Sequence, residues 1–455
     1  MRSARLISTC VFFCVLPCCF AGTEQPLPTE AQTSILAALR QHTGGTQKGA
    51  QNPASPKLTG IRPWAQLAKL SSSNQFPYFF GASVAISGNT IVVGAPNGGY
   101  AGVFVKPATG WRNMTEVATL NPSGELCDFG TSVAISGDTI VVGQPQSQFC
   151  STSLGTAYVF VKPPGGWGGT LTPTATLTAS DAAANDALGF SVSIDGGTVV
   201  AGAPGTYASN DPGAAYVFVE PSNGWVNMTQ TAKLTASDGV ADELFGTAVS
   251  VSGATVFAGA PNAAISNNQS QGAAYAFVEP SGGWSNMTQT AKLTASDGAT
   301  SNSFGTSVAV DGQTVVIGAP NGTPGGAAYV FVEPASGWMN MNQTAKLAAT
   351  GGYSQDLMGS SVSVGGNRIV VGAPQYQSNY SGCRFCRAGA AYVFEKPTTG
   401  WVDETQKAKL TGSDARAFSY LGASVAISGR LALAGGMFNA VLQRTNGGVY
   451  IFAGP

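Results

Sequence analysis

Few residues of this chain have the chemistry that catalysis by a nucleophile needs. The sequence contains one histidine, His42, which lies before the repeated part of the chain. A Ser-His-Asp or Cys-His arrangement needs an imidazole beside its nucleophile. The sequence therefore argues against such an arrangement on the repeats.

Carboxylates are the remaining candidates for acid–base work, because two of them beside a glycosidic bond suffice to cleave it. No spacing singles out a pair. Asp238 and Asp297 recur in one Ala-Ser-Asp-Gly register, which indicates a structural turn. The carboxylates in or near the loops are Asp186, Asp211, Asp238, Asp242, Glu243 and Asp297. A polysaccharide-cleaving enzyme stays an alternative to a function in binding.

Cysteine usage is typical of an oxidising compartment. Four of the eight cysteines lie before residue 20, which leaves Cys127, Cys150, Cys383 and Cys386. We expect a disulfide between Cys127 and Cys150, because both lie in loops that emerge on one face of the same repeat. Cys383 and Cys386 are read as a local disulfide. Half a zinc site or a redox pair is the alternative, but it lacks a second Cys pair, a nearby His and a thioredoxin-like context.

The element that must position these residues is a repeat that occurs seven times. Each unit has Phe-Gly or a variant, then Gly-Ala-Pro or a relic of it, then Ala-Tyr-Val-Phe, then Ala-Lys-Leu. The two motif glycines are 13 positions apart in all seven units, as in Gly81 and Gly94. A period of about 50 to 60 residues with four short strands is typical of a propeller blade. The predicted fold is all-β, a seven-bladed β-propeller with four-stranded blades.

The order of the motifs predicts how the ring closes. The first Ala-Lys-Leu precedes the first Phe-Gly, and the last unit has no fourth strand of its own. We therefore expect the N-terminal strand Ala65 to Leu70 to complete the blade that begins at Leu421. This closure removes the open edge of the ring.

Local composition supports the predicted strands, and the repeat positions of the tryptophans indicate a packing role. Segments such as Thr90 to Val93 are rich in β-branched residues and are bounded by Ser-Gly-Asn or Ser-Gly-Asp turns. A tryptophan at one repeat position in each unit is expected to pack between blades rather than to bind ligand. These residues are Trp64, Trp111, Trp167, Trp225, Trp284, Trp338 and Trp401.

The repeated motifs resemble the FG-GAP repeats of integrin α-subunit propellers, and most closely short secreted bacterial repeats of this kind. The resemblance covers residues 64 to 453. It implies a ligand site on the face formed by the loops between strands two and three and between strand four and the next blade. It also suggests a role in adhesion, by analogy alone.

The turns between the first two strands depart from the integrin pattern. Integrin-type repeats often hold calcium in an Asp-rich loop, whereas each turn here, such as Ser136-Gly137-Asp138, offers at most one carboxylate. Calcium takes about six to eight oxygen ligands. We predict no calcium in these turns, and we expect no metal or other cofactor.

Loop lengths predict where a ligand binds. The spacing from the second motif glycine to the repeat phenylalanine ranges from 10 to 22, whereas that from this phenylalanine to the next Ala-Lys-Leu is 16 or 17. Variable loops on a rigid scaffold usually carry function. The longest runs from Gln375 to Gly389. The candidate ligand-binding residues are Tyr100, Phe149, Tyr207, Asn210, Asp211, Asn267, Asn268, Tyr376, Asn379, Tyr380, Arg384, Phe385 and Arg387.

The N-terminal segment and the net charge of the chain limit its expected location and partners. Residues 1–21 read as a signal peptide, 22–62 as a flexible linker and 63–455 as the propeller. A lipid anchor on Cys18 or Cys19 is disfavoured, because Pro17 stands where a small residue would be expected. The apolar run is too short for a membrane span, and a net charge of −1 argues against nucleic acid.

Three Asn-Met-Thr triplets, at Asn113, Asn227 and Asn286, occupy equivalent positions in their repeats. They are candidate glycosylation sites, although duplication of the repeat explains them equally well. Taken together, the sequence predicts a secreted or cell-surface, non-catalytic adhesion or binding module. Its expected partner is an extracellular protein or glycan, with a carbohydrate-binding lectin as the leading alternative.

Overall fold

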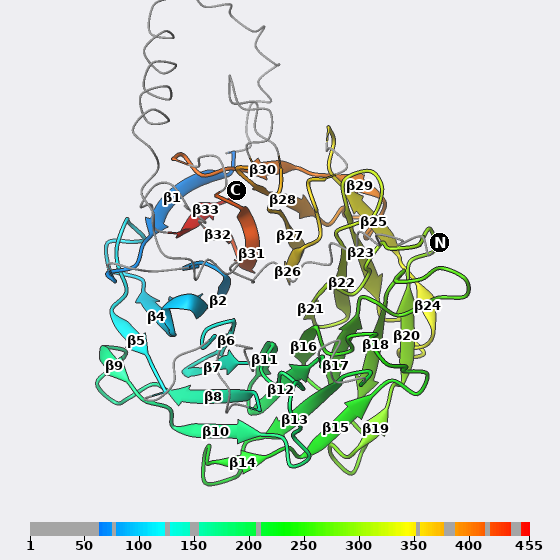
Figure 1. Cartoon of the computed structure of the whole chain (residues 1–455). Coiled ribbons are helices and arrows are strands. Elements are labelled where there is room, and N and C mark those ends of the chain that lie inside the picture. Colours follow the sequence, from blue (N-terminus) through cyan, green and yellow to red (C-terminus); the bar gives the residue numbers. More distant parts are fainter. Residues whose placement is uncertain are drawn as a thin grey trace, which may run out of the picture. The chain divides into compact units, whose positions relative to one another are not determined.

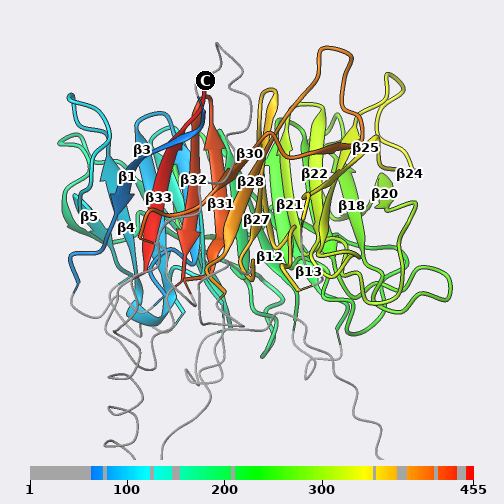
Figure 2. The same cartoon turned by 90° about the horizontal axis from the view of Figure 1, so that it is seen from above.

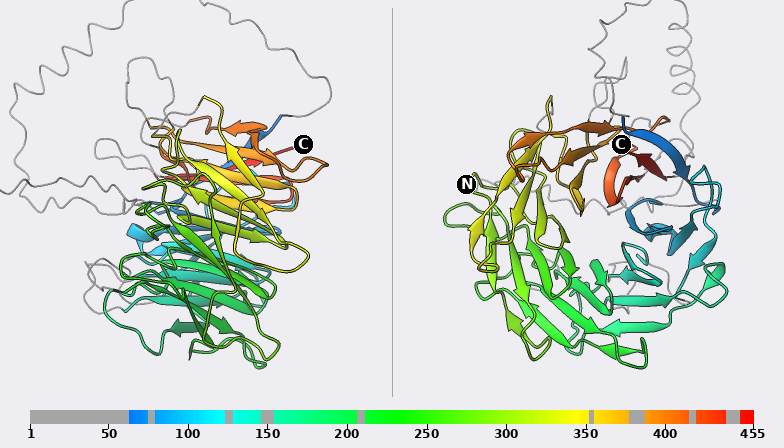
Figure 3. Two further views of the ribbon diagram at one scale, coloured as in Figure 1. Left: turned by 90° about the vertical axis from the view of Figure 1, so that its right-hand side faces the viewer. Right: turned by 180° about the vertical axis from the view of Figure 1, so that it is seen from behind.

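Each repeat folds into an antiparallel sheet, because short β-branched segments alternate with glycine-containing turns. The computed structural model describes residues 63–74, 79–122, 128–145, 154–205, 211–351, 355–376, 387–414, 419–437 and 447–455. These belong to one unit, Ile61–Pro455. Seven sheets form a ring, seen end-on in Figure 1 and from behind in Figure 3. The prediction of a seven-bladed propeller is confirmed.

The first strand of every blade lies innermost, and neighbouring first strands contact one another around the ring. The first strands are β2 (Ser83–Ser87), β6 (Ser132–Ser136), β11 (Ser191–Asp195), β16 (Ala248–Ser252), β21 (Ser307–Asp311), β26 (Ser361–Gly365) and β31 (Leu421–Ser428). The second strands are β3 (Thr90–Ala95), β7 (Thr139–Gln144), β12 (Thr198–Ala203), β17 (Thr255–Ala260), β22 (Thr314–Ala319), β27 (Arg368–Ala373) and β32 (Leu431–Gly436).

The third and fourth strands complete each blade toward the outer rim. The third strands are β4 (Tyr100–Val105), β8 (Thr156–Val161), β13 (Ala214–Val219), β18 (Ala273–Val278), β23 (Ala327–Val332), β28 (Ala390–Glu395) and β33 (Gly448–Ala453). The fourth strands are β5 (Ala118–Leu120), β10 (Ala175–Thr178), β15 (Ala232–Thr235), β20 (Ala291–Thr294), β25 (Ala345–Ala348), β30 (Ala408–Leu410) and β1 (Ala65–Leu70).

Ring closure occurs as the motif order predicts. Strand β1 pairs antiparallel with β33, so that Leu70 lies opposite Val449 in blade 7. Figure 2 shows the strands of this blade side by side. In the described part of the chain the only helical turn is η1 (Pro96–Gly98), and no helix there is long and apolar enough to cross a membrane.

Five blades gain a short fifth strand that the sequence did not predict. Each fifth strand comes from the next blade along the chain and pairs in parallel with a fourth strand, as Met287 does with Leu234. These strands are β9 (Gly169–Leu171), β14 (Met228–Thr229), β19 (Met287–Thr288), β24 (Met341–Asn342) and β29 (Glu404–Thr405).

The Asn-Met-Thr triplets lie where residues of one blade pair with the fourth strand of the preceding blade. Asn286 Oδ1 accepts a hydrogen bond of 2.8 Å from the backbone N–H of Lys233, and Asn227 and Asn113 make the equivalent bonds. Asn340 and Asp403 do the same without a sequon. The recurrence of this asparagine therefore has a structural reason.

The two glycines of the repeat meet across each blade interface. A Cβ added to Gly259 would lie 2.0 Å from the carbonyl oxygen of Gly305. Gly305 itself has φ +93°, a conformation that other residues rarely adopt. The seven pairs are Gly94–Gly130, Gly143–Gly189, Gly202–Gly246, Gly259–Gly305, Gly318–Gly359, Gly372–Gly422 and Gly435–Gly81. Backbone contact without side chains fixes how closely neighbouring blades approach.

Seven apolar clusters fill the spaces between the blades. Each lies between two neighbouring blades and contains one of the seven tryptophans. Trp225 is 5% exposed between blades 2 and 3. The prediction that the tryptophans pack between blades is confirmed.

Aspartate–lysine ion pairs, here called clasps, join the loop after one blade to the outer strands of the next. Asp181 follows β10, and its Oδ2 lies 2.6 Å from Lys233 Nζ on β15. Its Oδ1 accepts a hydrogen bond of 3.0 Å from the Tyr216 hydroxyl, and the Lys233 ammonium lies over the Tyr216 ring. The other clasps pair Asp238 with Lys292, Asp297 with Lys346 and Asp414 with Lys69. The last clasp secures β1 to the ring.

These clasps predict how stability depends on pH. Partial burial opposes ionisation of the four aspartates, but hydrogen bonds from lysine and tyrosine outweigh it and lower the pKa of each carboxyl. A carboxyl whose pKa is lower in the folded state stabilises the fold at neutral pH. This contribution falls as the pH drops below about 4 and through the folded-state pKa.

We therefore expect replacement of all four aspartates by asparagine to lower the free energy of unfolding at pH 7 by about 1 to 4 kcal/mol, since exposed ion pairs contribute about 0.2 to 1 kcal/mol each. The variant should also lose less stability than the wild type between pH 5 and 3. Urea unfolding at several pH values measures both. Asp138→Asn, which removes an exposed pair with Lys162, is the control. An equal loss of unfolding free energy between pH 5 and 3 in the variant and the wild type would contradict this prediction.

Candidate ligand-binding face

The loops that vary in length all emerge on one face of the ring, here called the loop face. It carries the connections between second and third strands, such as residues 96–99, and those between blades, such as residues 236–247. The antiparallel order of the strands places both kinds of connection at the same end of every blade. The opposite end, the turn face, carries the short turns between first and second strands.

Tyr100 stands at the start of β4, at the base of its loop. It is 4% exposed, and its hydroxyl contacts Ser72 Oγ. Burial raises the pKa of Tyr100 to about 12. The side chain packs in the core between blades 7 and 1, so it offers a ligand little surface. The ligand-binding role of Tyr100 stays a prediction.

Two other candidates are exposed on the loop face. Asn267 lies at the tip of a tight turn closed by two backbone hydrogen bonds between Ile265 and Asn268. The Asn268 amide donates to Gln271 Oε1 at 2.8 Å, which holds the turn while Asn267 faces solvent. Asp211 is also exposed, and its Oδ1 accepts the backbone N–H of Gly213 at 2.9 Å.

Tyr376 and Arg387 lie on either side of the longest loop. Tyr376 packs edge-on against Tyr392, with ring centroids 6.4 Å apart, and the Lys409 ammonium lies 3.3 Å from its ring centroid. The backbone N–H of Gly389 donates to the Tyr376 carbonyl oxygen. Tyr376 and Arg387 are both half-buried. The base of this loop is therefore anchored to blade 6.

The remaining candidates lie outside the described residues, and their roles stay predictions. They are Phe149, Tyr207, Asn210, Asn379, Tyr380, Arg384 and Phe385. The predicted disulfide cysteines Cys127, Cys150, Cys383 and Cys386 also lie outside them, as do the proposed signal peptide and linker.

The structure places the candidate loop-face carboxylates in different surroundings. Asp238 and Asp297 are held in the clasps between blades, so their recurring register is structural, as expected, but reflects ion pairs as well as a turn. Glu243 is 6% exposed. Burial raises the pKa of Glu243, and the charge of Asp238 adds to the rise. Burial likewise raises the pKa of Asp186, whose Oδ2 accepts the backbone N–H of Ala183.

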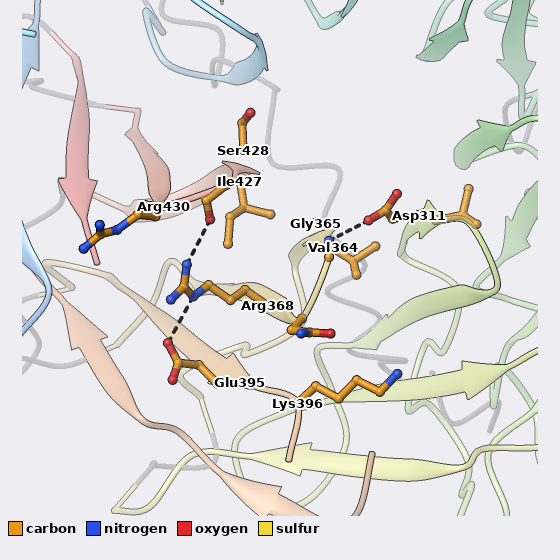
Figure 4. Close-up of a pocket in the computed structure, with 13 residues that line it drawn as sticks. Asp311, Val364, Gly365, Arg368, Glu395, Lys396, Ile427, Ser428 and Arg430 are labelled. Carbon is orange, nitrogen blue, oxygen red and sulfur yellow. Dashed lines mark hydrogen bonds and ion pairs between the residues drawn. The ribbon is translucent and has the colours of Figure 1, made fainter. Parts of the chain in front are cut away.

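The turn face holds a pocket that the sequence did not indicate. It has a volume of about 710 Å3 and lies where blades 5, 6 and 7 meet (Figure 4). In blades 1 to 5 a serine or aspartate accepts the N–H of the next turn, as Asp311 does from Gly366 at 2.6 Å. Blade 6 has Gly365 at this position and lacks that acceptor.

Arg368 bridges blades 6 and 7 at this pocket. Its guanidinium donates to Glu395 Oε1 at 3.1 Å, to the Gly429 carbonyl oxygen at 3.2 Å and to the Pro455 carbonyl oxygen at 2.9 Å. With these donors engaged, Arg368 supports the wall. Lys396 is exposed and extends from the wall (Figure 4). The available sequence signals for this pocket were Gly365, where the other units have serine or aspartate, and Arg368, where five units have threonine.

Comparisons with known proteins agree with this architecture. The hydrazine synthase of Kuenenia stuttgartiensis has a similar structure, with a TM-score of 0.51 and 12% identity, over 84% of this chain and 97% of that one. At this identity the likeness shows the fold alone. A comparison with curated protein sequences finds no match.

The sequence pattern described as "FG-GAP repeat" matches the chain seven times and covers well over half of it. The matched residues are 64–103, 121–160, 171–218, 228–277, 287–331, 341–394 and 405–452. Each match contains the Phe-Gly and Gly-Ala-Pro motifs of one unit or their variants. The chain belongs to the FG-GAP repeat family.

Proposed function

We propose that this protein is a secreted or cell-surface, non-catalytic module that binds a protein or glycan through its loop face. The FG-GAP propeller fold supports a general binding or adhesion role. FG-GAP repeats are typically extracellular, which agrees with the proposed signal peptide over residues 1–21.

One observation carries the proposal: variable loops stand on a rigid ring. The connections on the loop face differ in length from blade to blade, whereas the glycine contacts, clasps and tryptophans repeat around the ring. Exposed Asn267 and Asp211 can hydrogen-bond a ligand, and Tyr376 offers part of an aromatic ring. Such a mixture suits a sugar or a peptide loop.

A carbohydrate-binding lectin is the alternative within this function. The exposed amide of Asn267 and the half-buried ring of Tyr376 are the kinds of group that bind hydroxyls and stack on sugar faces. Two candidate carboxylates of the enzyme alternative, Asp238 and Asp297, are ion-paired in the clasps.

A binding screen tests the proposal and separates its alternatives. Residues 22–455 are applied to arrays of glycans and matrix proteins, beside a variant in which residues 377–386 are replaced by a short Gly-Ser turn. This design keeps Tyr376 and Gly389, which anchor the base of the loop. We expect at least about tenfold weaker binding by the variant, because a few central contacts dominate most interfaces.

Lys396→Ala, at the turn-face pocket, is the matched control and should bind normally. Glycan hits identify a lectin and protein hits an adhesin. Binding that survives the loop replacement but is lost in Lys396→Ala would move the site to the turn face.

A further inference from the structure

The series of side-chain bonds that links neighbouring turns on the turn face is interrupted at the pocket. In blades 1 to 5 a serine or aspartate at the end of the first strand accepts the N–H of a glycine in the next turn. The five pairs are Ser87–Gly137, Ser136–Gly196, Asp195–Gly253, Ser252–Gly312 and Asp311–Gly366. Blade 6 has Gly365 at this position, and glycine has no side chain that could accept the N–H of Gly429.

The backbones of blades 6 and 7 nevertheless keep the alignment of the other pairs. Ser363 Oγ accepts a backbone N–H of β31 at 3.1 Å, just as Ser193 Oγ accepts one of β16 at 3.1 Å. These serines stand two residues before Gly365 and Asp195, respectively. Only the side-chain acceptor is therefore missing beside Gly429, which is itself exposed at the pocket.

The other blades show that a carboxylate fits against a glycine N–H in these turns. Asp195 Oδ2 lies 2.7 Å from the backbone nitrogen of Gly253, and Asp311 Oδ2 lies 2.6 Å from that of Gly366. Hydrogen bonds to an ionised acceptor are roughly twice as strong as those between neutral groups. The turn of blade 7 thus offers a donor that suits a carboxylate from outside the chain.

Positive charge flanks this turn. Lys396 and Arg430 line the pocket and are exposed, and neither forms an ion pair with a described residue. Arg430 Nε donates to the Gly454 carbonyl oxygen at 3.1 Å, which holds the guanidinium against the end of blade 7. The position of Lys396 carries an acid in blades 3 to 5, namely Glu220, Glu279 and Glu333.

The two acids of the pocket are engaged within the protein. Asp311 binds the turn of blade 6, and Glu395 is paired with Arg368 (Figure 4). The lining therefore carries three cationic side chains and two carboxylates, so positive charge predominates. Such a lining attracts anions.

The size of the pocket indicates more than a single ion. Its volume of about 710 Å3 lies within the range of small-molecule sites, which is roughly 300 to 1,000 Å3. Val310, Val364 and Ile427 contribute apolar surface to the lining. An organic acid can place its charged group at the turn and its body against these side chains.

We propose that the turn-face pocket binds a small organic carboxylate. The carboxylate accepts the N–H of Gly429, in the place that an aspartate takes in blades 3 and 5, and Lys396 and Arg430 attract its charge. The valine and isoleucine side chains contact its body. This site differs from the loop-face site in its position and in its ligand.

A titration with two carboxylates tests the proposal. The probes are glucuronate and glutarate, which carry the same group on a sugar and on an aliphatic chain, and glucose is the uncharged control. The chemical shift of the Gly429 amide proton in the full chain measures binding. We expect a saturable change with at least one carboxylate and none with glucose. The carboxylate that binds more tightly identifies the kind of body that the pocket takes.

Substitutions of Gly365 show whether the missing acceptor creates the site. Gly365→Asp and Gly365→Ser supply the acceptors of the other blades. We expect about 10- to 100-fold weaker binding by Gly365→Asp, because the bond to the charged ligand is lost. Gly365→Ala adds the same Cβ without an acceptor and should bind more tightly than Gly365→Ser.

The fold has room for these side chains. A Cβ at Gly365 would lie 3.2 Å from Ile427 Cγ2, the end of a side chain that can shift, and Gly365 does not adopt a positive φ. No binding of either carboxylate by the wild type, or equal binding by Gly365→Asp and Gly365→Ala, would overturn the proposal.

Hydrogen exchange provides a second measurement that needs no variant. Without a probe we expect the Gly429 amide to exchange faster than the Gly366 amide, which Asp311 holds, and to slow when the carboxylate binds. Equal protection without a probe would mean that the chain itself supplies an acceptor, and this would also overturn the proposal. Replacement of residues 377–386 should leave both measurements unchanged, so failure of this site and failure of the loop-face site are distinguishable.

Discussion

Gly259→Ala is expected to lower the free energy of unfolding by more than about 4 kcal/mol, or to prevent folding. The added methyl carbon would lie 2.0 Å from the Gly305 carbonyl oxygen, which is backbone and cannot swing aside. Blades 4 and 5 would have to separate, which loosens the apolar cluster around Trp338. Urea unfolding followed by tryptophan fluorescence measures the change.

Gly282→Ala is the control for this prediction. It lies in the same blade, has no atom within 4 Å of the added carbon and does not adopt a positive φ. We expect it to change stability by less than about 0.5 kcal/mol. If Gly259→Ala were as stable as Gly282→Ala, the glycine contacts would not set the spacing of the blades.

Removal of β1 is expected to have the second large effect. A chain that starts at Ser71 loses Ala68 and Leu70, which are 1% and 0% exposed, together with the clasp between Lys69 and Asp414. Loss of one buried leucine side chain alone costs about 2 to 5 kcal/mol. We therefore expect a truncated protein that aggregates or melts at least about 10 °C lower than a chain starting at Ile61.

Scanning calorimetry and size-exclusion chromatography compare the two chains. A synthetic peptide of residues 63–72 should partly restore the melting temperature of the shorter chain, because it supplies the missing strand. An unchanged melting temperature after truncation would show that blade 7 is complete without β1.

The sequence was sufficient to predict the blades and their closure, because fixed motif spacings imply equal units. Contacts between units were harder to predict. Gly94 meets Gly130 of the next unit, yet the repeat looks the same whichever copy supplies the partner. Asp181 and Lys233 are 52 positions apart in the sequence. Their neighbours in sequence indicate a turn and a strand, but they do not indicate that the two side chains form an ion pair.

Side-chain exposure in the loops was the least predictable property. Tyr100 reads as a loop aromatic from its spacing, but it opens β4 and its ring fills the core between blades. Asn267, another candidate from the same loop pattern, is exposed at the tip of a turn. The difference depends on the exact residue at which the third strand begins, and repeat spacing does not fix that residue.

Each fifth strand comes from the blade that follows in the chain, and this order has a consequence for biosynthesis. Each blade from 1 to 5 has its outer edge covered by residues of the blade that follows it in the chain. During synthesis from the N-terminus, an emerging blade thus protects its predecessor, and few strand edges are open to wrong pairing at any time. Strand β1 is the exception: it leaves the ribosome before every blade and cannot pair with β33 until the last blade has been made.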